Sequence, residues 1–366
     1  MTTLCKPSVV VPEHIITREE TLELARRMHA GHPQLELVLR LISNTGVQKR
    51  HLIRPIEQTL THPGWAERTR LYEEHAKARL PGAIEQALAN AEANAADIDA
   101  ILYVSCTGFT MPALTAWMIN HLGFRSDTSQ IPMAQLGCAA GGSAINRALD
   151  FCIAHLGTNA LIVACEFCSL CYQPDDVGIG ELLSTGLFGD AVAAAVVRGD
   201  DRVGGVHLEL SGSALVPNSE PWISYEIKDT GFHFRLDKRV PQSAKYLAPA
   251  LRDTSTRHGW DASCLDFYVV HAGGPRVLDG VAAHLEIDSA ALRHSRATLT
   301  EHGNIASTGI FDSLSKHFDE GNDSGARGII AAFGPGITAE VTLGTWTGPA
   351  RPDSSHSADG AEGDLW

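Results

Sequence analysis

The sequence lacks an apolar run long enough to cross a bilayer, and its first residues, Met1-Thr-Thr-Leu-Cys-Lys, have no signal-peptide hydrophobic region. We therefore expect a soluble, cytoplasmic protein. Basic residues are also few: 29 lysines and arginines stand against 43 aspartates and glutamates, which gives a net charge of −14. This charge argues against nucleic acid or an anionic membrane as the main partner, although a local basic patch for a phosphorylated cofactor is compatible with it.

Sequence signatures of metal, flavin or nicotinamide sites are missing as well. Cys165, Cys168 and Cys171 have the Cys-x-x-Cys spacing of zinc and iron–sulfur sites, but no second cysteine pair or closely spaced histidine pair completes such a site. In a regular strand residue 168 would also face away from residues 165 and 171. We interpret the eight cysteines as reduced thiols. A metal- or redox-binding protein built on this cluster is the alternative from a different class of function.

The most informative segment is Gly137-Cys138-Ala-Ala-Gly-Gly142, a cysteine between a glycine and small residues where an apolar strand passes into an amphipathic helix. Small neighbours let a substrate approach the sulfur, and a helix that begins near Ala139 directs its positive dipole end at a thiolate. The segment predicts a nucleophilic thiol. An inert, buried cysteine is the alternative.

A faint internal repeat supports the first interpretation, because three landmarks of the second half follow those of the first in nearly the same register. The repeat predicts a duplicated α/β unit, with Cys138 and Asn304 at the starts of equivalent helices and His271 at the carboxyl end of a strand, where ligands gather. The matched segments are the strands that end at Cys106 and His271, Gly137-Cys138-Ala139 with Gly303-Asn304-Ile305, and residues 160–165 with residues 327–332.

The order of local patterns predicts the organisation of the chain. We expect a helical region over residues 14–95, which Thr17-Arg-Glu-Glu opens as a capping box, and α/β units over 97–198 and 244–346. Alternating residues between these units predict a β-rich connector of exposed or pocket-lining strands. The expected parts are an N-terminal half with the cysteine, a C-terminal half with the histidine and asparagine, and a disordered tail; their bounds are 1–210, 211–347 and 348–366.

Further segments share a characteristic order and approximate spacing. They are Leu187-Phe-Gly-Asp190, Val270-His-Ala-Gly-Gly-Pro275, Gly303-Asn-Ile-Ala-Ser307 and Phe333-Gly-Pro-Gly336. With Gly137-Cys138 they resemble the chalcone synthase-like type III polyketide synthases of the thiolase superfamily, over nearly the whole chain apart from the tail. The resemblance implies an α/β, thiolase-like fold with a duplicated αβαβα architecture of five layers, and a homodimer.

Three other segments resemble most closely the bacterial members that make 1,3,6,8-tetrahydroxynaphthalene. Such an enzyme condenses five malonyl-CoA units, with malonyl as starter, by decarboxylative Claisen condensation and cyclises the pentaketide. Coenzyme A thioesters are then its substrates, and no bound cofactor or metal is implied. The segments are Val104-Ser-Cys-Thr-Gly108, Cys165-Glu-Phe-Cys-Ser-Leu-Cys-Tyr-Gln-Pro174 and Thr230-Gly-Phe-His-Phe234.

The resemblance also implies residue roles. Cys138 carries the growing chain, and an imidazolium at His271 would favour its thiolate. His271 and the Asn304 amide can donate hydrogen bonds to the enolate oxygen that decarboxylation creates. Phe188 and Phe234 match an apolar pair between the coenzyme A tunnel and the elongation cavity, with ordinary aromatic core as the alternative.

Further positions are assigned to the cavity wall and to coenzyme A. We consider that Cys106 steers or holds an intermediate. A solvated charge run is the alternative for the basic residues. The wall positions are Cys106, Cys171, Tyr225, Ala306, Gly334 and Pro335, and the basic positions for the phosphates of coenzyme A are Lys49, Arg50 and Arg54.

The chain departs from the family pattern at Ser224, Thr308 and Ala332, which bears on the product. The second hypothesis is a type III synthase that uses a fatty acyl-CoA starter to make pyrones or resorcinols. A ketoacyl synthase III-like enzyme would share the Cys, His and Asn set, but the contexts of Phe188 and of Phe333-Gly-Pro-Gly336 favour the polyketide branch.

Overall fold

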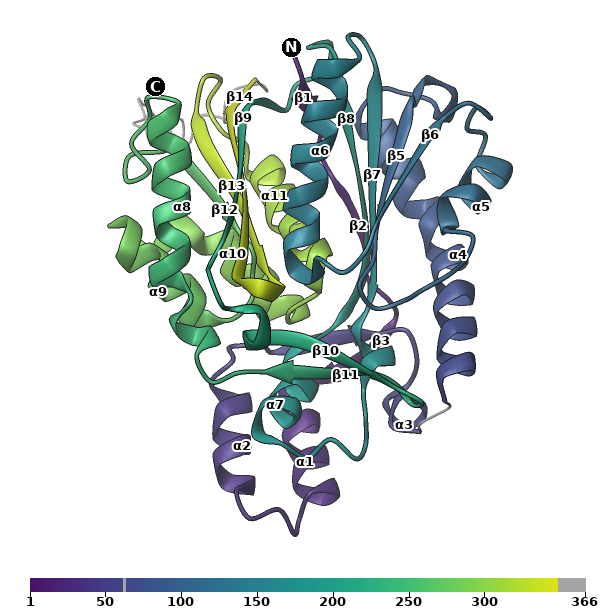
Figure 1. Cartoon of the computed structure of the whole chain (residues 1–366), viewed down its shortest axis with the longest axis vertical. Helices are drawn as coiled ribbons and strands as arrows, with labels where there is room; N and C mark the ends of the chain where they lie inside the picture. Colours follow the sequence, from purple (N-terminus) through teal and green to yellow (C-terminus); the bar gives the residue numbers. More distant parts are fainter. Residues whose placement is uncertain (62–63, 348–366) are drawn as a thin grey trace, which may run out of the picture.

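The computed structural model describes residues 1–61 and 64–347, so the predicted tail lies outside the described residues. One mixed ten-stranded sheet runs through the molecule (Figure 1). In sheet order its strands are β12 (Phe267–Val270), β13 (Arg327–Gly334), β14 (Thr338–Trp346), β9 (Val206–Leu215), β1 (Thr3–Leu4), β8 (Asp190–Arg198), β7 (Asn159–Phe167), β5 (Ala100–Val104) and β6 (Ser129–Met133), and β2 (Ser8–Val10) pairs with β8.

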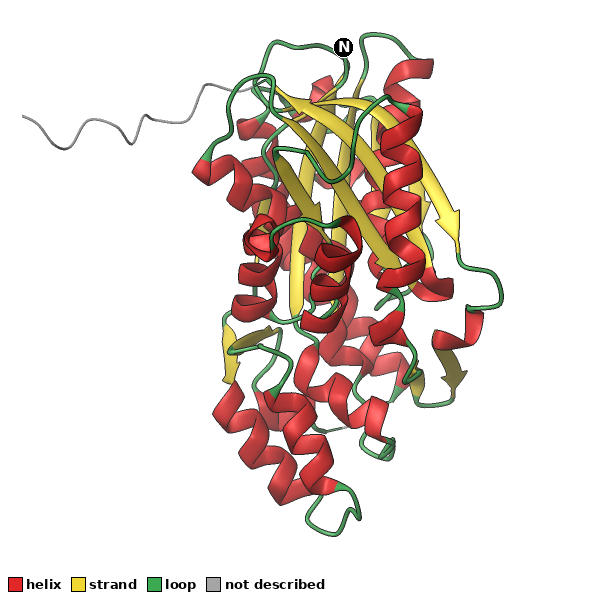
Figure 2. Cartoon of the chain, turned by 90° about the vertical axis from the view of Figure 1, so that its left-hand side faces the viewer, coloured by secondary structure: helices red, strands yellow, loops and turns green. Residues whose placement is uncertain are grey.

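The sheet has two halves, and a central layer of helices lies between them. Helices α6 (Ala140–Ala154) and α11 (Gly309–Glu320) contact strands of both halves. On one outer side α8 (Ala244–Arg257) covers β9, β13 and β14, and on the other α4 (Trp65–Asn90) covers β2, β7 and β8. Figure 1 shows the resulting layers from left to right, and in Figure 2 outer helices lie in front of the strands. The expected α/β class and five-layer architecture are confirmed.

Strands β7 and β8 near the middle of this sheet are almost continuously apolar because helices cover both of their faces. Every residue of β8 is buried, and so are all residues of β7 except the first. Four further helices of the two α/β units are α5 (Leu114–His121), which follows β5, α7 (Ile179–Leu187), α9 (Pro275–Leu285) beside α8, and α10 (Arg293–His302) beside α11. None of the helices within residues 1–61 and 64–347 is long and apolar enough to cross a membrane.

The predicted repeat is visible in the connections. Strand β5 pairs in parallel with β7, and β12 pairs in parallel with β13. In the first unit a 3₁₀ turn at Gly137–Ala139 leads into α6, and in the second a 3₁₀ turn at Ala306–Thr308 leads into α11. The two central helices are therefore equivalent elements that begin at the same end of the molecule.

The small residues after Cys138 allow these two helices to approach each other. A Cβ atom at Gly141 would lie 2.3 Å from the backbone oxygen of Ser307, and one at Gly142 would lie 2.6 Å from the Cβ of Ala332. Both distances are far inside van der Waals contact. The glycines thus serve the packing of α6 against the second half, whereas the sequence suggested that they leave room for substrate.

Replacing Gly141 with alanine is expected to lower the free energy of unfolding by about 1–3 kcal/mol, because the added methyl group overpacks the contact with Ser307. Gly82 in α4 is the matched control, since a Cβ atom there meets nothing within 4 Å. Gly82→Ala should stabilise by about 0.5–1 kcal/mol, the ordinary gain for a helix interior. Urea unfolding of the two variants measures the difference, and equal stabilities would contradict the packing argument.

The N-terminal region is helical as predicted, apart from one hairpin. Its helices are α1 (Arg18–Met28), α2 (Leu35–Ser43), α3 (Ile56–Thr59) and α4, and Thr17 caps α1 through the predicted capping box. This hairpin pairs β3 (His14–Thr17) with β4 (Lys49–Leu52). In the sequence β3 precedes α1 and β4 follows α2. Because the pairing is distant in sequence and each strand has four residues, local patterns did not indicate it.

The β-rich connector splits into two parts. Strand β9 lies inside the main sheet between β1 and β14, so the prediction of an exposed or pocket-lining strand was wrong for its start, where Val206 and Leu208 are buried. Strands β10 (Ile223–Lys228) and β11 (Gly231–Leu236) form a separate hairpin below the sheet in Figure 1. The predicted division at residue 210 falls within β9 and stays a prediction.

Candidate active site

A cavity of about 1040 Å³ lies where the central helices begin, and Cys138, His271 and Asn304 all line it. Cys138 is part of the 3₁₀ turn before α6. His271 directly follows β12, and Asn304 precedes the 3₁₀ turn before α11. The structure therefore brings these three side chains to one cavity from the positions that the repeat predicted.

Burial controls the protonation of the thiol and the imidazole. It raises the pKa of Cys138 to about 12, and the negative charge of Glu166 acts in the same direction. It lowers the pKa of His271 to about 4, and no neighbouring charge opposes this shift. Both shifts favour a thiol and a neutral imidazole over the thiolate–imidazolium pair that the sequence suggested.

The lowered pKa of His271 predicts a loss of stability in acid. An unfolded histidine binds a proton below pH 6.5, whereas the folded chain resists this until about pH 4. The stabilisation is present above pH 6.5 and is lost as the pH falls towards 4. At pH 5 the loss from His271 should be about 2 kcal/mol.

Between pH 7.5 and pH 5, the free energy of unfolding of His271→Gln should fall by about 2 kcal/mol less than that of wild type. The measurement is urea unfolding at both pH values. His317→Gln is a parallel case outside the cavity, because burial lowers the pKa of His317 to about 3. Identical pH dependence in wild type and His271→Gln would show that His271 is not held neutral.

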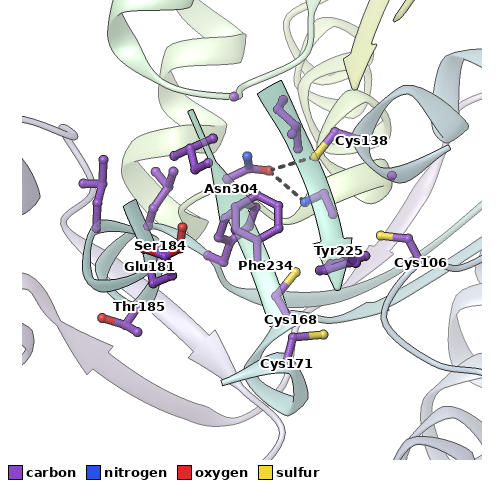
Figure 3. A pocket seen from close by; sticks show the side chains of 18 of the residues that line it. Cys106, Cys138, Cys168, Cys171, Glu181, Ser184, Thr185, Tyr225, Phe234 and Asn304 are labelled. Atoms are coloured by element: carbon purple, nitrogen blue, oxygen red, sulfur yellow. Dashed lines mark hydrogen bonds between the residues drawn. The ribbon is translucent and has the colours of Figure 1, made fainter. Parts of the chain in front are cut away.

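The amide of Asn304 has a fixed orientation. Its Oδ1 accepts a hydrogen bond from the backbone N–H of Ala306 at 2.9 Å and lies 3.9 Å from the sulfur of Cys138 (Figure 3). Nδ2 makes no hydrogen bond to any described residue, so two N–H donors are left for a ligand. The local backbone is strained, with φ at +49° for Ala306, which is typical of functional sites.

An aromatic wall lies beside this centre. The rings of Phe188 and Phe234 pack edge to face with centroids 5.2 Å apart, and Tyr225 packs against Phe234 at 5.6 Å. All three line the cavity. Phe188 and Phe234 are half-buried, and Phe188 also packs against a buried apolar cluster that includes Phe333.

The three further cysteines of this cavity are Cys106, Cys168 and Cys171 (Figure 3). Strand β7 ends at Phe167, and the next four residues form a 3₁₀ helix. Residues i and i+3 of such a helix share a face, so Cys168 and Cys171 point to the same cavity while Cys165 stays buried in the strand. The prediction that residue 168 faces away from residue 171 was wrong. A helical period for this segment would have placed Cys168 and Cys171 on one face.

The sequence-based reasoning also missed Glu166, which is fully buried at the end of β7. Its carboxylate accepts hydrogen bonds from Ser307 Oγ at 2.5 Å, Thr107 Oγ1 at 2.9 Å and the backbone N–H of Cys106 at 3.1 Å. It thus ties both halves together behind the cysteines. A single charge inside an apolar strand was the available signal.

The other predicted wall positions, Ala306, Gly334 and Pro335, also line the cavity. Pro335 packs so closely on Gly137 that a Cβ atom there would lie 2.6 Å from its ring. The Phe333-Gly-Pro-Gly336 loop therefore braces the turn that carries Cys138. Of the three departures from the family pattern, Ser224 lines the cavity, whereas Thr308 and Ala332 are fully buried outside its lining.

The three predicted coenzyme A residues are placed differently from the expectation. Arg50 lines the cavity but is only 6% exposed, and its guanidinium binds protein oxygens. Lys49 and Arg54 are not among the lining residues. Arg276, in the first turn of α9, is the other arginine of the described lining; it is exposed and forms no ion pair or hydrogen bond with a described residue.

Within residues 1–61 and 64–347, no group of three or more His, Cys, Asp or Glu side chains is arranged to hold a metal ion. All eight cysteines are free thiols.

The chain matches known proteins over most of its length. The N-terminal domain model of the chalcone and stilbene synthases matches residues 3–201, and their C-terminal domain model matches residues 207–345. The 1,3,6,8-tetrahydroxynaphthalene synthase of Streptomyces coelicolor is 64% identical over 94% of this chain and 92% of that protein. The enzyme of the same name from Streptomyces griseus is 60% identical over 94% and 93%.

A solved structure is similar over the same range. The crystal structure of the Streptomyces coelicolor 1,3,6,8-tetrahydroxynaphthalene synthase, described as a bacterial type III polyketide synthase, superposes with a TM-score of 0.93. It covers 95% of this chain and all of the solved chain, at 64% identity. Germicidin synthase from Streptomyces coelicolor, also a type III polyketide synthase, is 27% identical and gives a TM-score of 0.88 over 94% and 99% of the two chains.

Proposed function

The chain belongs to the chalcone and stilbene synthase family of type III polyketide synthases, and on that basis we propose that it makes 1,3,6,8-tetrahydroxynaphthalene from five malonyl-CoA units. The observation that carries the proposal is the single cavity in which Cys138, His271 and Asn304 meet. Identity of 60–64% over nearly the full length supports this product. Coenzyme A thioesters are the substrates of the family.

Loading begins with the neutral imidazole of His271. It takes the proton of the Cys138 thiol as the sulfur attacks the malonyl thioester carbonyl, and coenzyme A leaves as a thiol once that proton is returned. A general base is needed here because burial holds the pKa of Cys138 at about 12. The cycle leaves the chain as a thioester on Cys138 and His271 neutral again.

Extension requires the next malonyl-CoA to lose carbon dioxide. Negative charge moves from the carboxylate to the thioester oxygen, where Asn304 Nδ2 and a ring N–H of His271 donate hydrogen bonds. The apolar rings of Phe188 and Phe234 disfavour the carboxylate relative to neutral carbon dioxide. The enolate carbon then attacks the Cys138 thioester, and the lengthened chain, now on coenzyme A, returns to Cys138.

The phosphates of coenzyme A need a cation outside this apolar centre. Arg276 lines the cavity, is exposed and has no partner among the described residues, so we assign this role to it in place of Lys49, Arg50 and Arg54. In a chain of net charge −14 a free cation at the cavity also favours the approach of an anionic substrate. The homodimer and the cytoplasmic location stay predictions, as does the holding of an intermediate by Cys106.

Product analysis with malonyl-CoA alone tests the proposal. We expect mass spectrometry to detect 1,3,6,8-tetrahydroxynaphthalene or flaviolin, the quinone that forms from it in air. No product from malonyl-CoA, followed by pyrones or resorcinols once a long acyl-CoA is added, would replace this function by the second hypothesis. Absence of product with either substrate would contradict both.

A further inference from the structure

Arg50 occupies an unusual position for a cation that lines a substrate cavity. It belongs to β4 and is only 6% exposed. Its Nη1 donates to the backbone oxygens of Thr185, at 2.5 Å, and Phe188, at 3.1 Å, and its Nη2 donates to Thr21 Oγ1 at 2.8 Å. The guanidinium is thus engaged by α1 and by the end of α7.

Phe188, whose backbone oxygen accepts a hydrogen bond from Arg50, forms a short parallel bridge with Asn304. Asn304 donates its backbone N–H to the oxygen of Leu187 at 2.9 Å, and Gly189 donates to the oxygen of Asn304 at 3.1 Å. These two bonds connect the two halves of the protein. They fix the backbone of Asn304 relative to the segment that carries the Phe188 ring.

The hydrocarbon part of Arg50 packs directly on this bridge. A Cβ atom at Gly303 would lie 3.0 Å from Arg50 Cγ, and one at Gly189 would lie 3.6 Å from Arg50 Cβ. The nearest atoms to both positions are backbone oxygens, of Leu187 for Gly303 and of His302 for Gly189, each at 2.4 Å, so the glycines allow the two backbones to approach, with the arginine stem packed beside them. Arg50 packs beside the bridge through its stem and binds the backbone oxygen of the bridge residue Phe188 through its head.

Arg50 keeps its charge in this setting. Burial lowers its pKa to about 10, while the negative charge of Asp190 acts in the opposite direction. At neutral pH the guanidinium is protonated, and each buried N–H requires an acceptor. A shift of the Phe188 carbonyl away from Arg50 would leave a buried charged donor unpaired, so the arginine resists displacement of the bridge.

We propose that Arg50 is a positioning residue for decarboxylation: by holding the Phe188–Asn304 bridge, it sets the Asn304 amide and the Phe188 ring against the malonyl group. The proposal rests on the roles given to Asn304 and Phe188 under the proposed function. Loading of Cys138 from a simple acyl thioester needs neither the Asn304 amide donors nor carbon dioxide release. Loss of Arg50 should therefore slow decarboxylation more than loading.

Arg50→Lys is the test, because lysine keeps the charge but cannot bind Thr185, Phe188 and Thr21 with one planar head. We expect the kcat of malonyl-CoA decarboxylation to fall about 10- to 100-fold, the usual effect of a displacement near 1 Å. Acylation of Cys138 by acetyl-CoA, followed by intact-protein mass spectrometry, should stay within about twofold of wild type. Equal losses in both steps, or no loss in either, would overturn the proposal.

Two control variants distinguish positioning from general damage and from binding of coenzyme A. Arg68→Lys changes an equally buried arginine that holds the backbone oxygens of Leu170 and Tyr172, and it should leave decarboxylation within about twofold. Arg276→Ala should raise KM for malonyl-CoA and leave KM for the malonyl thioester of N-acetylcysteamine unchanged, because that thioester lacks the phosphates. If Arg50→Lys follows the Arg276→Ala pattern, Arg50 binds coenzyme A and the positioning role is wrong.

A milder variant covers the case in which Arg50→Lys does not fold. Thr21→Val removes one acceptor of the guanidinium and leaves the stem on Gly303 and Gly189. It should produce a smaller decarboxylation loss in the same direction, again with unchanged acylation, and no such loss would overturn the proposal. Failure of wild type to decarboxylate malonyl-CoA at all would instead contradict the proposed function.

Discussion

Cys138→Ala is expected to lower the rate of product formation by at least about 10³-fold, because no other group then carries the growing chain. Malonyl-CoA decarboxylation should remain measurable in this variant, since the enolate is stabilised by His271 and Asn304 and not by the thiol. Intact-protein mass spectrometry should show no acyl adduct at the cavity after incubation with malonyl-CoA. Product and carbon dioxide release are measured on the same samples.

The Cys138→Ala variant needs a control for other thiols, because four of the residues that line the cavity are cysteines. Cys264→Ala removes an exposed thiol that does not line the cavity and should leave all rates unchanged. Retained pentaketide formation in Cys138→Ala would mean that another cavity thiol, such as Cys106 or Cys168, carries the chain. Complete loss of decarboxylation would mean that the thiol is needed for that step as well.

Most of the central fold could be predicted from the sequence, because the patterns that indicate it are local. Strands such as β7 and β8 are nearly continuous apolar runs, and the repeat places Cys138 and Asn304 at equivalent helix starts. These features follow from periodicity and order along the chain. The β3–β4 hairpin and the place of β9 in the main sheet depend on partners distant in sequence, which no local pattern encodes.

The same distinction applies to the side chains of the site. A strand-based period misplaced Cys168, because the strand ends one residue earlier and a 3₁₀ helix follows. The resemblance suggested Arg50 as a ligand of coenzyme A, but its neighbours in space turn it inward. The resting protonation of Cys138 and His271 likewise depends on burial, and burial is a property of the assembled fold.

The second large effect is expected at Asn304. Asn304→Asp keeps an oxygen that can accept the Ala306 N–H, so the loop geometry is retained, but it removes the two Nδ2 donors and adds a negative charge. Both changes oppose an enolate oxyanion. Decarboxylation at pH 7.5 should fall about 10²- to 10³-fold, as for loss of an oxyanion-hole donor. Carbon dioxide release from malonyl-CoA measures this directly.

The pH dependence of this variant separates donor loss from general damage. As the pH falls through the pKa of the new carboxyl group, its protonated form regains one O–H donor and loses the charge, so decarboxylation should partly recover. Burial lowers the pKa of His271 to about 4 in wild type, so wild type measured over the same pH range reports any contribution from the protonation of His271. Wild type has no such carboxyl and should show no gain. A variant that stays within tenfold of wild type at pH 7.5, or that shows no recovery in acid while still folded, would contradict the role of Nδ2 as the enolate donor.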